Sequence, residues 1–589
     1  AVSLHLPIYV FRVVLERRKR LTEFSKLMGL RMTAYWTGSF LFDYSVHLFY
    51  CALAIIFGYG FQMSTFKQSG GPAILLFLLW GLAQVPTGYV ISAFFKEERT
   101  ATIATYLLCF FGEMLAVCLN LFVFPLQRAP WWYMWYPPFT FVRGIYLIEL
   151  GGANQVPVQF LSPSTGPSSE MAAVYMILAA QAVIFFLLSI YIDLVMPKEW
   201  GNQRSPLFPI LWLVDKCRST VGSGKSNDGY SAIADEEEVY LDPESADRRY
   251  SVKLRQSGIA EEARKATQDE SYYLRCIDIT KRYGKKLALD HFYLAMPESG
   301  ECFGLLGENG SGKTTLISIL TGMIKPTSGR ALVNNRPSHE NLLGFCPQHD
   351  ILWDDLTPEE HMAFYFRVKG FRPSDYNDQP MHQAIASILD QVSLTSRSTV
   401  RTSELSGGMK RKLSISISLV ANPQLVLLDE PTTGLDVDAR REIWDILEEV
   451  KKGRSMMLTT HIMEEADTLC SRIGILKKGR FLCVASGQEL KQIYGSAYEL
   501  GVTTTRENAQ FVAERIVELF PTATLQSSYS GVLQFFVPQQ DLKFGHLFHT
   551  MKRVKQELGI REWGINQCGL NQVFLAATRA ADVPDIEVM

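Results

Sequence analysis

Four apolar stretches, each long enough to cross a lipid bilayer, constrain this chain more than any other feature of its sequence. They lie at about residues 34–61, 71–95, 101–124 and 171–195. A helix rises about 1.5 Å per residue, so about 20 apolar residues cross the hydrocarbon core. Because lipid cannot hydrogen-bond exposed backbone groups, such segments have to be helical. The sequence therefore predicts an α-helical polytopic membrane domain over residues 1–200.

Charged residues near the spans predict their orientation. Residues 12–31 carry seven basic and two acidic side chains, and an excess of positive charge marks the cytoplasmic side. Four crossings that begin on that side also end on it, so the chain after Pro197 is expected in the cytosol. The apolar run at residues 4–15 is too short to cross a bilayer. We interpret it as the end of a span that begins upstream, which makes the chain a fragment.

Residues 127–170 are expected on the outer side of the membrane. A cluster of tryptophans and tyrosines precedes Pro137 and Pro138, and a moderately apolar run follows at residues 139–150. Aromatic rings of this kind favour the headgroup level, which indicates an interfacial or re-entrant helical hairpin. Both an anchoring role and a lipid-handling role are compatible with this pattern.

Three ionisable residues fall inside the predicted spans. Asp43 and His47 are four residues apart, on one face of a helix, and Glu113 lies in the third span. An ionisable group in a span is a candidate for a substrate pathway. Alternatively, these side chains bond neighbouring helices.

The remainder of the chain is soluble in character. The charge of the whole chain is balanced, with 58 basic and 60 acidic residues, which argues against a nucleic-acid partner. Residues 201–270 are mostly rich in small and charged side chains and are expected to form a flexible cytosolic linker. The ten cysteines show no disulfide spacing, so reduced thiols are expected.

A phosphate-binding loop provides the clearest functional signal. The apolar strand 303–306 runs into the loop, and an apolar helix follows it. Successive backbone N–H groups and the helix N-terminus can bind phosphate oxygens, Lys313 supplies positive charge, and the Thr314 hydroxyl can ligate Mg²⁺. The predicted nucleotide-binding residues of this loop are Gly307, Asn309, Gly310, Ser311, Gly312, Lys313, Thr314 and Thr315.

Two further segments carry chemistry. An apolar strand at residues 424–428 ends in Asp429, which can hold Mg²⁺ through water, and Glu430, which can polarise the attacking water. A helix opens at Ser406, Gly407 and Gly408, and its free N-terminal amides can bind another anion.

Together these motifs resemble the nucleotide-binding domain of ATP-binding-cassette (ABC) transporters. The resemblance implies an α/β P-loop ATPase domain over residues 271–495 that binds ATP and Mg²⁺. It implies that Tyr283 stacks on adenine, that Gln348 senses Mg²⁺ and that His461 contacts the γ-phosphate. Met409 stands where most members have glutamine. Together with residues 410–414 (KRKLS), it makes the chain similar to the second half of subfamily A transporters.

Residues 496–589 alternate strand-like and helix-like runs in the order β-α-β-β-α-β with a trailing helix. This order predicts a small α+β ferredoxin-like domain. It contains no cluster of titratable or metal-ligating residues, and the resemblance implies a regulatory domain.

The resemblance implies an ATP-driven transporter that moves lipids or other amphiphiles between leaflets. Its partner would be the N-terminal half of the same transporter or a second cassette, because each ATP is sandwiched between two cassettes. The alternative is an ATP-gated conduit or a regulator of another membrane protein.

Overall fold

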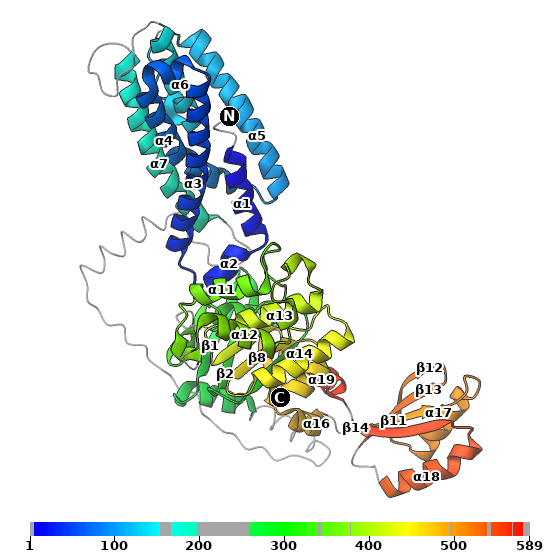
Figure 1. Ribbon diagram of the computed structural model, residues 1–589. Coiled ribbons are helices and arrows are strands. Elements are labelled where there is room, and N and C mark those ends of the chain that lie inside the picture. The colour runs from blue at the N-terminus through cyan, green and yellow to red at the C-terminus, as the bar shows by residue number, and fades with distance from the viewer. Residues whose placement is uncertain are drawn as a thin grey trace. The chain divides into compact units, whose positions relative to one another are not determined.

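The structure is a computed structural model that divides into two compact units, Ala1–Tyr230 and Ser231–Met589 (Figure 1). It describes residues 5–125, 127–153, 167–196, 258–338, 343–376, 379–494, 497–538, 544–567 and 569–580. Most of the expected linker, residues 201–257, lies outside the described residues.

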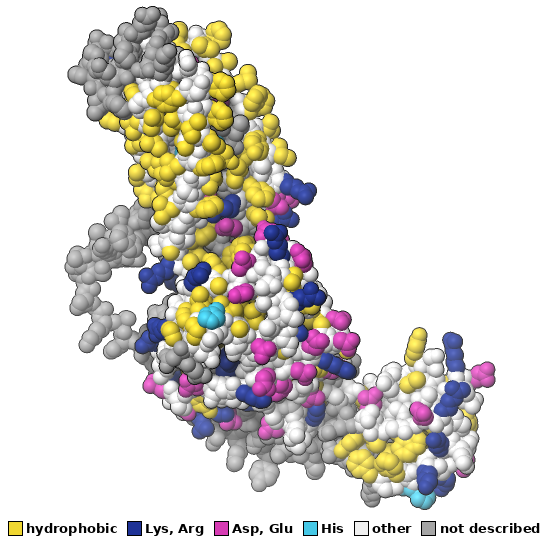
Figure 2. Space-filling model, in the orientation of Figure 1, with side chains coloured by type: hydrophobic (Ala, Val, Ile, Leu, Met, Phe, Trp, Pro, Cys, Tyr) yellow, Lys and Arg dark blue, Asp and Glu magenta, His cyan; other side chains and the backbone are white. Residues whose placement is uncertain are grey.

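The first unit is helical throughout its described residues. Its helices are α1 (Leu6–Arg18), α2 (Leu21–Leu27), α3 (Met32–Gly60), α4 (Ser64–Ser92), α5 (Glu98–Cys118), α6 (Pro137–Ala153) and α7 (Pro167–Val195), with short η2 (Leu119–Val123) and η3 (Tyr133–Trp135). Among the described residues, four helical stretches are long and apolar enough to cross a membrane: Met32–Gly60, Ser69–Ser92, Glu98–Val123 and Glu170–Val195. They confirm the four predicted spans, and hydrophobic side chains cover much of their visible surface (Figure 2).

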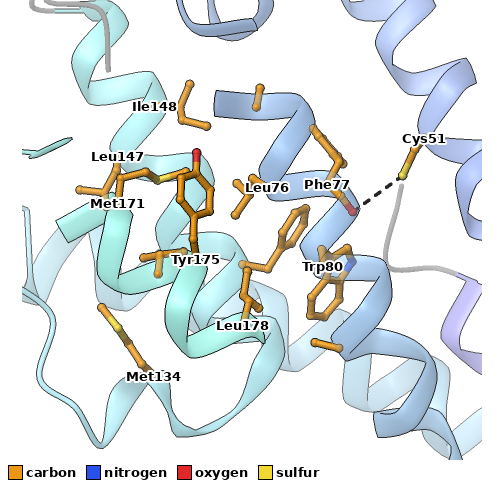
Figure 3. Close-up of a cluster of buried hydrophobic side chains, with 14 of the residues drawn as sticks. Cys51, Leu76, Phe77, Trp80, Met134, Leu147, Ile148, Met171, Tyr175 and Leu178 are labelled. Carbon is orange, nitrogen blue, oxygen red and sulfur yellow. Dashed lines mark hydrogen bonds between the residues drawn. The ribbon is translucent and has the colours of Figure 1, made fainter. Parts of the chain in front are cut away.

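Helices α3, α4, α6 and α7 bury a common apolar cluster (Figure 3). Trp80 of α4 stacks on Phe141 of α6 with ring centroids 4.7 Å apart, and Leu147 and Ile148 add to the same core. Helix α6 therefore packs as an integral part of the helical unit.

A buried ion pair joins the helices around α6. Arg143 is only 2% exposed, and its Nε and Nη2 donate to the two carboxylate oxygens of Glu170 at 2.9 and 3.0 Å. Its Nη1 donates to Asn120 Oδ1 at 3.0 Å. Because every nitrogen of the guanidinium has an acceptor, the desolvation cost of this buried charge is largely offset.

The second unit begins with a nucleotide-binding-type α/β domain. A six-stranded sheet has the order β10-β9-β3-β8-β7-β6, in which β10 alone is antiparallel, and a four-stranded antiparallel sheet has the order β2-β1-β4-β5. The strands are β1 (Leu274–Tyr283), β2 (Lys286–Met296), β3 (Cys302–Gly307), β4 (Ser328–Val333), β5 (Arg336–Pro337), β6 (Gly344–Cys346), β7 (Leu425–Asp429), β8 (Ser455–Thr460), β9 (Arg472–Lys477) and β10 (Arg480–Ala485).

Strands β3, β7 and β8 are buried at every residue, as expected for parallel strands covered on both faces. The helices around them are α10 (Lys313–Leu320), α11 (Pro358–Val368), α12 (Met381–Gln391), α13 (Gly407–Ser418), α14 (Val437–Val450), α15 (Met463–Leu469) and α16 (Gly487–Tyr494), with short η6 (Pro373–Tyr376), η7 (Thr395–Arg397) and η8 (Thr402–Glu404). The eight cysteines within the described residues are free thiols.

A helix at residues 258–268 differs from the flexible linker that the composition predicted. Buried Glu262 accepts a hydrogen bond from the Ala295 amide at 3.1 Å and pairs with Arg472. Ala266 packs with Ile277 and Ala295 in a small core. The end of the expected linker is therefore a folded part of the α/β domain.

The C-terminal residues form a third sheet of order β12-β13-β11-β14, antiparallel throughout. Its elements are β11 (Ala497–Thr503), α17 (Ala509–Leu519), β12 (Thr524–Tyr529), β13 (Val532–Pro538), α18 (Phe544–Glu557) and β14 (Glu562–Gln567). Apolar residues of the sheet, α17 and α18 share one core. This arrangement is compatible with the predicted ferredoxin-like fold.

The last described helix, α19 (Leu570–Ala580), does not belong to that core. Leu570, Val573 and Phe574 pack with Leu306 of β3 and Ile475 of β9. The sequence predicted that the α/β domain ends at residue 495. In the structure the chain returns after β14, and α19 packs with the α/β core.

Candidate nucleotide-binding site

The phosphate loop connects buried β3 to α10, as the sequence predicted. Gly310 and Gly312 have φ angles of 81° and 117°, a left-handed conformation that favours glycine. A Cβ on Gly312 would also lie 2.5 Å from the Ala288 carbonyl oxygen. The loop can therefore approach β2 closely only with glycine at this position.

Lys313 begins α10 and is buried. Its Nζ donates to the carbonyl oxygens of Gly307 at 2.7 Å and Glu308 at 3.2 Å. Burial lowers the pKa of Lys313, and the nearby Glu430 and Asp429 carboxylates partly oppose that shift. Next to it, the buried Ser311 Oγ has no hydrogen-bond partner among the described residues. A buried hydroxyl in this state is suited to bonding a ligand oxygen.

Asp429 ends β7 and is buried beside β8. Its Oδ1 accepts a hydrogen bond from Thr459 Oγ1 at 2.6 Å. Burial raises the pKa of Asp429, and this hydrogen bond opposes the shift. Asp429 is thus an oriented carboxylate whose charge a cation would stabilise.

Glu430 follows Asp429, and its carboxylate contacts three polar side chains. Its Oε2 accepts from Gln348 Nε2 at 3.0 Å and from Thr433 Oγ1 at 3.2 Å, and it lies 3.4 Å from His461 Nδ1. The backbone of Glu430 has a φ of 46°, a left-handed conformation that costs a non-glycine residue about 1–3 kcal/mol. Such strain persists only where surrounding contacts hold it.

A cavity of about 240 Å³ lies over the phosphate loop. It is lined by Tyr283, Lys286, Ala288, Asn309, Gly310, Gly312, Lys313, Thr314, Thr315, Gln348 and Glu430. The structure therefore brings most of the predicted site residues to one place. Lys286 and Ala288 were missed because they carry no motif; they reach the cavity through the β1–β2 hairpin that also carries Tyr283.

The remaining predicted residues lie around the cavity rather than in its lining. Gly307 and Ser311 form the inner part of the loop. Asp429 directly precedes Glu430 and accepts from Thr459, and His461 lies beside Glu430. Ser406 caps α13 by accepting the Met409 amide at 3.3 Å. Ser406, Gly407 and Gly408 are not among the residues lining the cavity, and Ser406 and Gly407 are exposed.

Two of the three ionisable candidates of the membrane unit bond neighbouring helices. Asp43 Oδ2 accepts from Arg12 Nη2 of α1 and from the Tyr89 hydroxyl of α4, both at 2.6 Å. Buried His47 lies with Nε2 3.0 Å from the Phe77 carbonyl oxygen. Glu113 has a buried Oε1 without a hydrogen-bond partner among the described residues. Asp43 and His47 thus join helices, and neither hydrogen-bonds the other.

The fold and this site define an ATP-binding cassette carried in one chain with a helical membrane unit. Residues 294–433 match the family described as "ABC transporter", residues 3–191 match "ABC-2 family transporter protein", and residues 495–567 match "ABCA1-like, C-terminal R1 regulatory domain". The cassette binds ATP and is an ATPase.

Relatives extend the match to nearly the whole chain. "ABC transporter A family member 7" of Dictyostelium discoideum is 32% identical over 596 residues, covering 98% of this chain and 69% of the relative. "ABC transporter A family member 4" of Arabidopsis thaliana is 30% identical over 617 residues, covering 99% of this chain and 62% of the relative. The chain belongs to the A family of ABC transporters, and it spans about two thirds of the length of these relatives.

Among solved structures, one titled "Structure of ATP binding subunit of ABC transporter" is 26% identical, with a TM-score of 0.34. The match covers 38% of this chain and 93% of that chain.

Proposed function

We propose that this chain is part of an ATP-driven transporter that moves lipids or other amphiphiles between membrane leaflets. The observation that carries the proposal is the convergence of Lys313, Gln348 and Glu430 on one cavity. The same chain holds four helices long enough to cross a membrane. A hydrolytic site and spanning helices in one chain favour coupling between ATP hydrolysis and helix movement.

The cavity's own residues account for nucleotide binding. Backbone N–H groups of the glycine-rich loop and the N-terminus of α10 would bind the β- and γ-phosphates, with Lys313 supplying charge. Tyr283 lines the same cavity and is 47% exposed. Lys281 Nζ lies 5.2 Å from the centroid of its ring, and the ring would stack on adenine.

Mg²⁺ would be held by Thr314 and Asp429, with Gln348 beside them. The donor set fits, because hydroxyl and carboxylate oxygens are ligands that Mg²⁺ prefers, and it commonly binds through one or two protein groups plus phosphates. The unpartnered Ser311 Oγ leaves a further polar atom for the nucleotide. When bound, Mg²⁺ neutralises charge on the phosphates.

Glu430 would polarise the attacking water. Gln348 and His461 both approach its Oε2. Glu430 also lines the cavity over the phosphate loop, where a γ-phosphate would lie. His461, with 49% of its side chain exposed, would contact that phosphate as the nucleotide binds.

A second cassette would complete the site. Ser406 and Gly407 are exposed at the N-terminus of α13, where free amides favour an anion. This supports a sandwich in which this segment binds ATP on the partner, which we take to be the N-terminal half of the same transporter. Plotting ATPase rate against protein concentration tests this. A low flat rate rescued by that half supports it, whereas a second-order rise indicates pairing of two copies of this chain.

The basic residues of α1 and α2 favour a cytosolic cassette by the positive-inside rule. Lipid as the transported substrate rests on the resemblance to subfamily A. The pairing of Asp43 with Arg12 and Tyr89 favours a structural role for this carboxylate over an ion path.

The test is reconstitution of the paired transporter in vesicles that contain fluorescent phospholipid. ATP should drive lipid movement against a gradient, and Glu430→Gln should abolish it. A passive ion current that ATP merely switches on, without lipid movement, would instead establish the conduit alternative.

A further inference from the structure

The guanidinium of Arg411 bonds both segments that carry the hydrolytic side chains. Arg411 lies on the second turn of α13, and only 3% of its surface is exposed. Its Nη1 donates to the carbonyl oxygens of Pro347 at 2.5 Å and Gln348 at 3.3 Å. Arg411 therefore fixes the backbone from which the Gln348 side chain projects.

The other two nitrogens of Arg411 bond the segment after β7. Nη2 lies 3.2 Å from the carbonyl oxygens of both Asp429 and Glu430, and Nε donates to the Pro431 carbonyl at 2.6 Å. Arg411 thus bonds the carbonyl oxygens of three consecutive residues, Asp429, Glu430 and Pro431.

These contacts act where the backbone is strained. Glu430 has a φ of 46°, its amide donates to the Thr459 carbonyl at 3.0 Å, and its carbonyl accepts from Arg411. Both polar groups of this strained residue are therefore held by buried partners. The Glu430 carbonyl also accepts from the Thr433 amide at 3.3 Å, so loss of Arg411 would remove one of two bonds to this carbonyl and loosen the position of the carboxylate.

Arg411 is itself held in place. Asp350 Oδ1 accepts from Arg411 Nη1 at 3.2 Å and from the Ser414 hydroxyl at 2.7 Å. Ser414 lies one turn along α13 from Arg411, so the helix supplies both donors to one carboxylate. The guanidinium is fully engaged, and lysine cannot reproduce it because an ammonium is a point charge without a planar fork.

We propose that Arg411 is a positioning residue for ATP hydrolysis. It holds the backbone at Gln348 and at Glu430 so that the two side chains meet, and it connects both segments to the helix capped by Ser406. This inference rests on the proposed function of the cassette. Movement of α13 when Ser406 and its neighbours engage an ATP on the partner would be transmitted through Arg411 to Glu430. Arg411 thereby links one ATP site of a cassette pair to the other.

The experiment measures ATPase kinetics and binding of a fluorescent ATP analogue for Arg411→Lys in the paired transporter. The kcat is expected to fall at least about tenfold with KM for ATP within about twofold, because the phosphate loop is untouched. Arg401→Lys, the same change at an exposed arginine ahead of α13, serves as the matched control and should keep the wild-type rate.

A double variant separates positioning from general stabilisation. If Arg411 acts through Glu430, Arg411→Lys should add little to the loss already caused by Glu430→Gln. An additive loss, a raised KM with unchanged kcat, or weakened nucleotide binding would overturn the inference. Should Arg411→Lys fail to fold, Ser414→Ala loosens the Asp350 support instead and should lower kcat about two- to fivefold, while a wild-type kcat would overturn the inference.

The ATPase rates of Arg411→Lys and Glu430→Gln distinguish failure of the inference from failure of the proposed function. Wild-type ATPase in Glu430→Gln would remove the proposed role of Glu430. A slow Glu430→Gln together with an unaffected Arg411→Lys would leave that role standing and reject positioning by Arg411.

Discussion

His461 Nδ1 lies 3.4 Å from Glu430 Oε2, the oxygen that also accepts a hydrogen bond from Gln348. The two residues follow β8 and β7, which are parallel neighbours. Their side chains meet because the carboxyl ends of parallel strands share one edge of a sheet. Glu430 is thereby oriented from two sides while it faces the cavity over the phosphate loop.

Glu430→Gln should keep nucleotide binding and slow hydrolysis by about 10²–10⁴-fold, the range for loss of a general base. Lys313→Ala should instead weaken ATP binding, because it removes positive charge from the phosphate site. Phosphate release and binding of a fluorescent ATP analogue measure the two effects separately.

Glu464→Gln, at an exposed residue of α15, is the control and should resemble wild type in both assays. Equal hydrolysis by wild type and Glu430→Gln would show that another group acts on the water.

Lys369 predicts a pH dependence of stability. Burial lowers the pKa of Lys369 to about 7, and its Nζ donates to the Val420 carbonyl at 2.9 Å. Above that pH the folded state lacks a proton that the unfolded chain still binds. The free energy of unfolding should therefore rise by about 1.4 kcal/mol per pH unit above about pH 7, and that stabilisation should be lost as the pH falls toward 7.

Lys369→Met should remove this slope. Thermal unfolding midpoints, followed by tryptophan fluorescence between about pH 7 and pH 9, should rise for the wild type and change little for the variant. Lys452→Met, at an exposed lysine, should keep the wild-type slope. Parallel curves for wild type and Lys369→Met would show that Lys369 stays protonated.

Asp43→Asn should lower the yield of folded protein. The change removes the buried carboxylate that pairs with Arg12, leaving Glu16 as its remaining countercharge, and weakens the hydrogen bond from Tyr89, a loss of about 1–3 kcal/mol. The monodisperse fraction after detergent extraction measures it. Ser45→Ala is the control, because the Ser45 hydroxyl bonds only a carbonyl of its own helix. Normal yield with loss of lipid-stimulated ATPase would point to a substrate pathway instead.

Phe574→Ala should destabilise the cassette. Phe574 of α19 is buried against the α/β core, and truncation of a buried phenylalanine typically costs about 3–5 kcal/mol. Phe511→Ala removes an exposed ring, 60% accessible on α17, and should change stability little. Limited proteolysis in the presence of ATP compares the two; equal resistance would show that α19 contributes nothing to the cassette.

The features that the sequence predicted are those written in consecutive residues. The four spans are continuous apolar runs, and the phosphate loop is one strand–loop–helix segment, so local composition and spacing suffice for both. The succession of elements in the C-terminal region, β-α-β-β-α-β with a trailing helix, likewise agrees with the predicted one.

The features that were missed depend on partners far apart in the chain. Residues 258–268 look polar enough for a linker, yet Glu262 is matched by Arg472, more than two hundred residues away. Arg143 and Glu170 pair across two helices. Lys286 joins the cavity only through its hairpin. The pattern of residues within a single segment cannot predict such pairs, because their members come together only when distant segments pack.

Helix α19 has a consequence for how the protein is made. Leu306, on the strand that leads into the phosphate loop, shares a buried cluster with residues of α19 that leave the ribosome only after the whole C-terminal sheet. Since domains fold as they emerge during synthesis, this cluster of the nascent cassette stays incomplete until translation has passed α19. Ribosome stalling or a premature stop in this region would therefore release a cassette whose motifs are all present but whose interior remains open to chaperones and proteases.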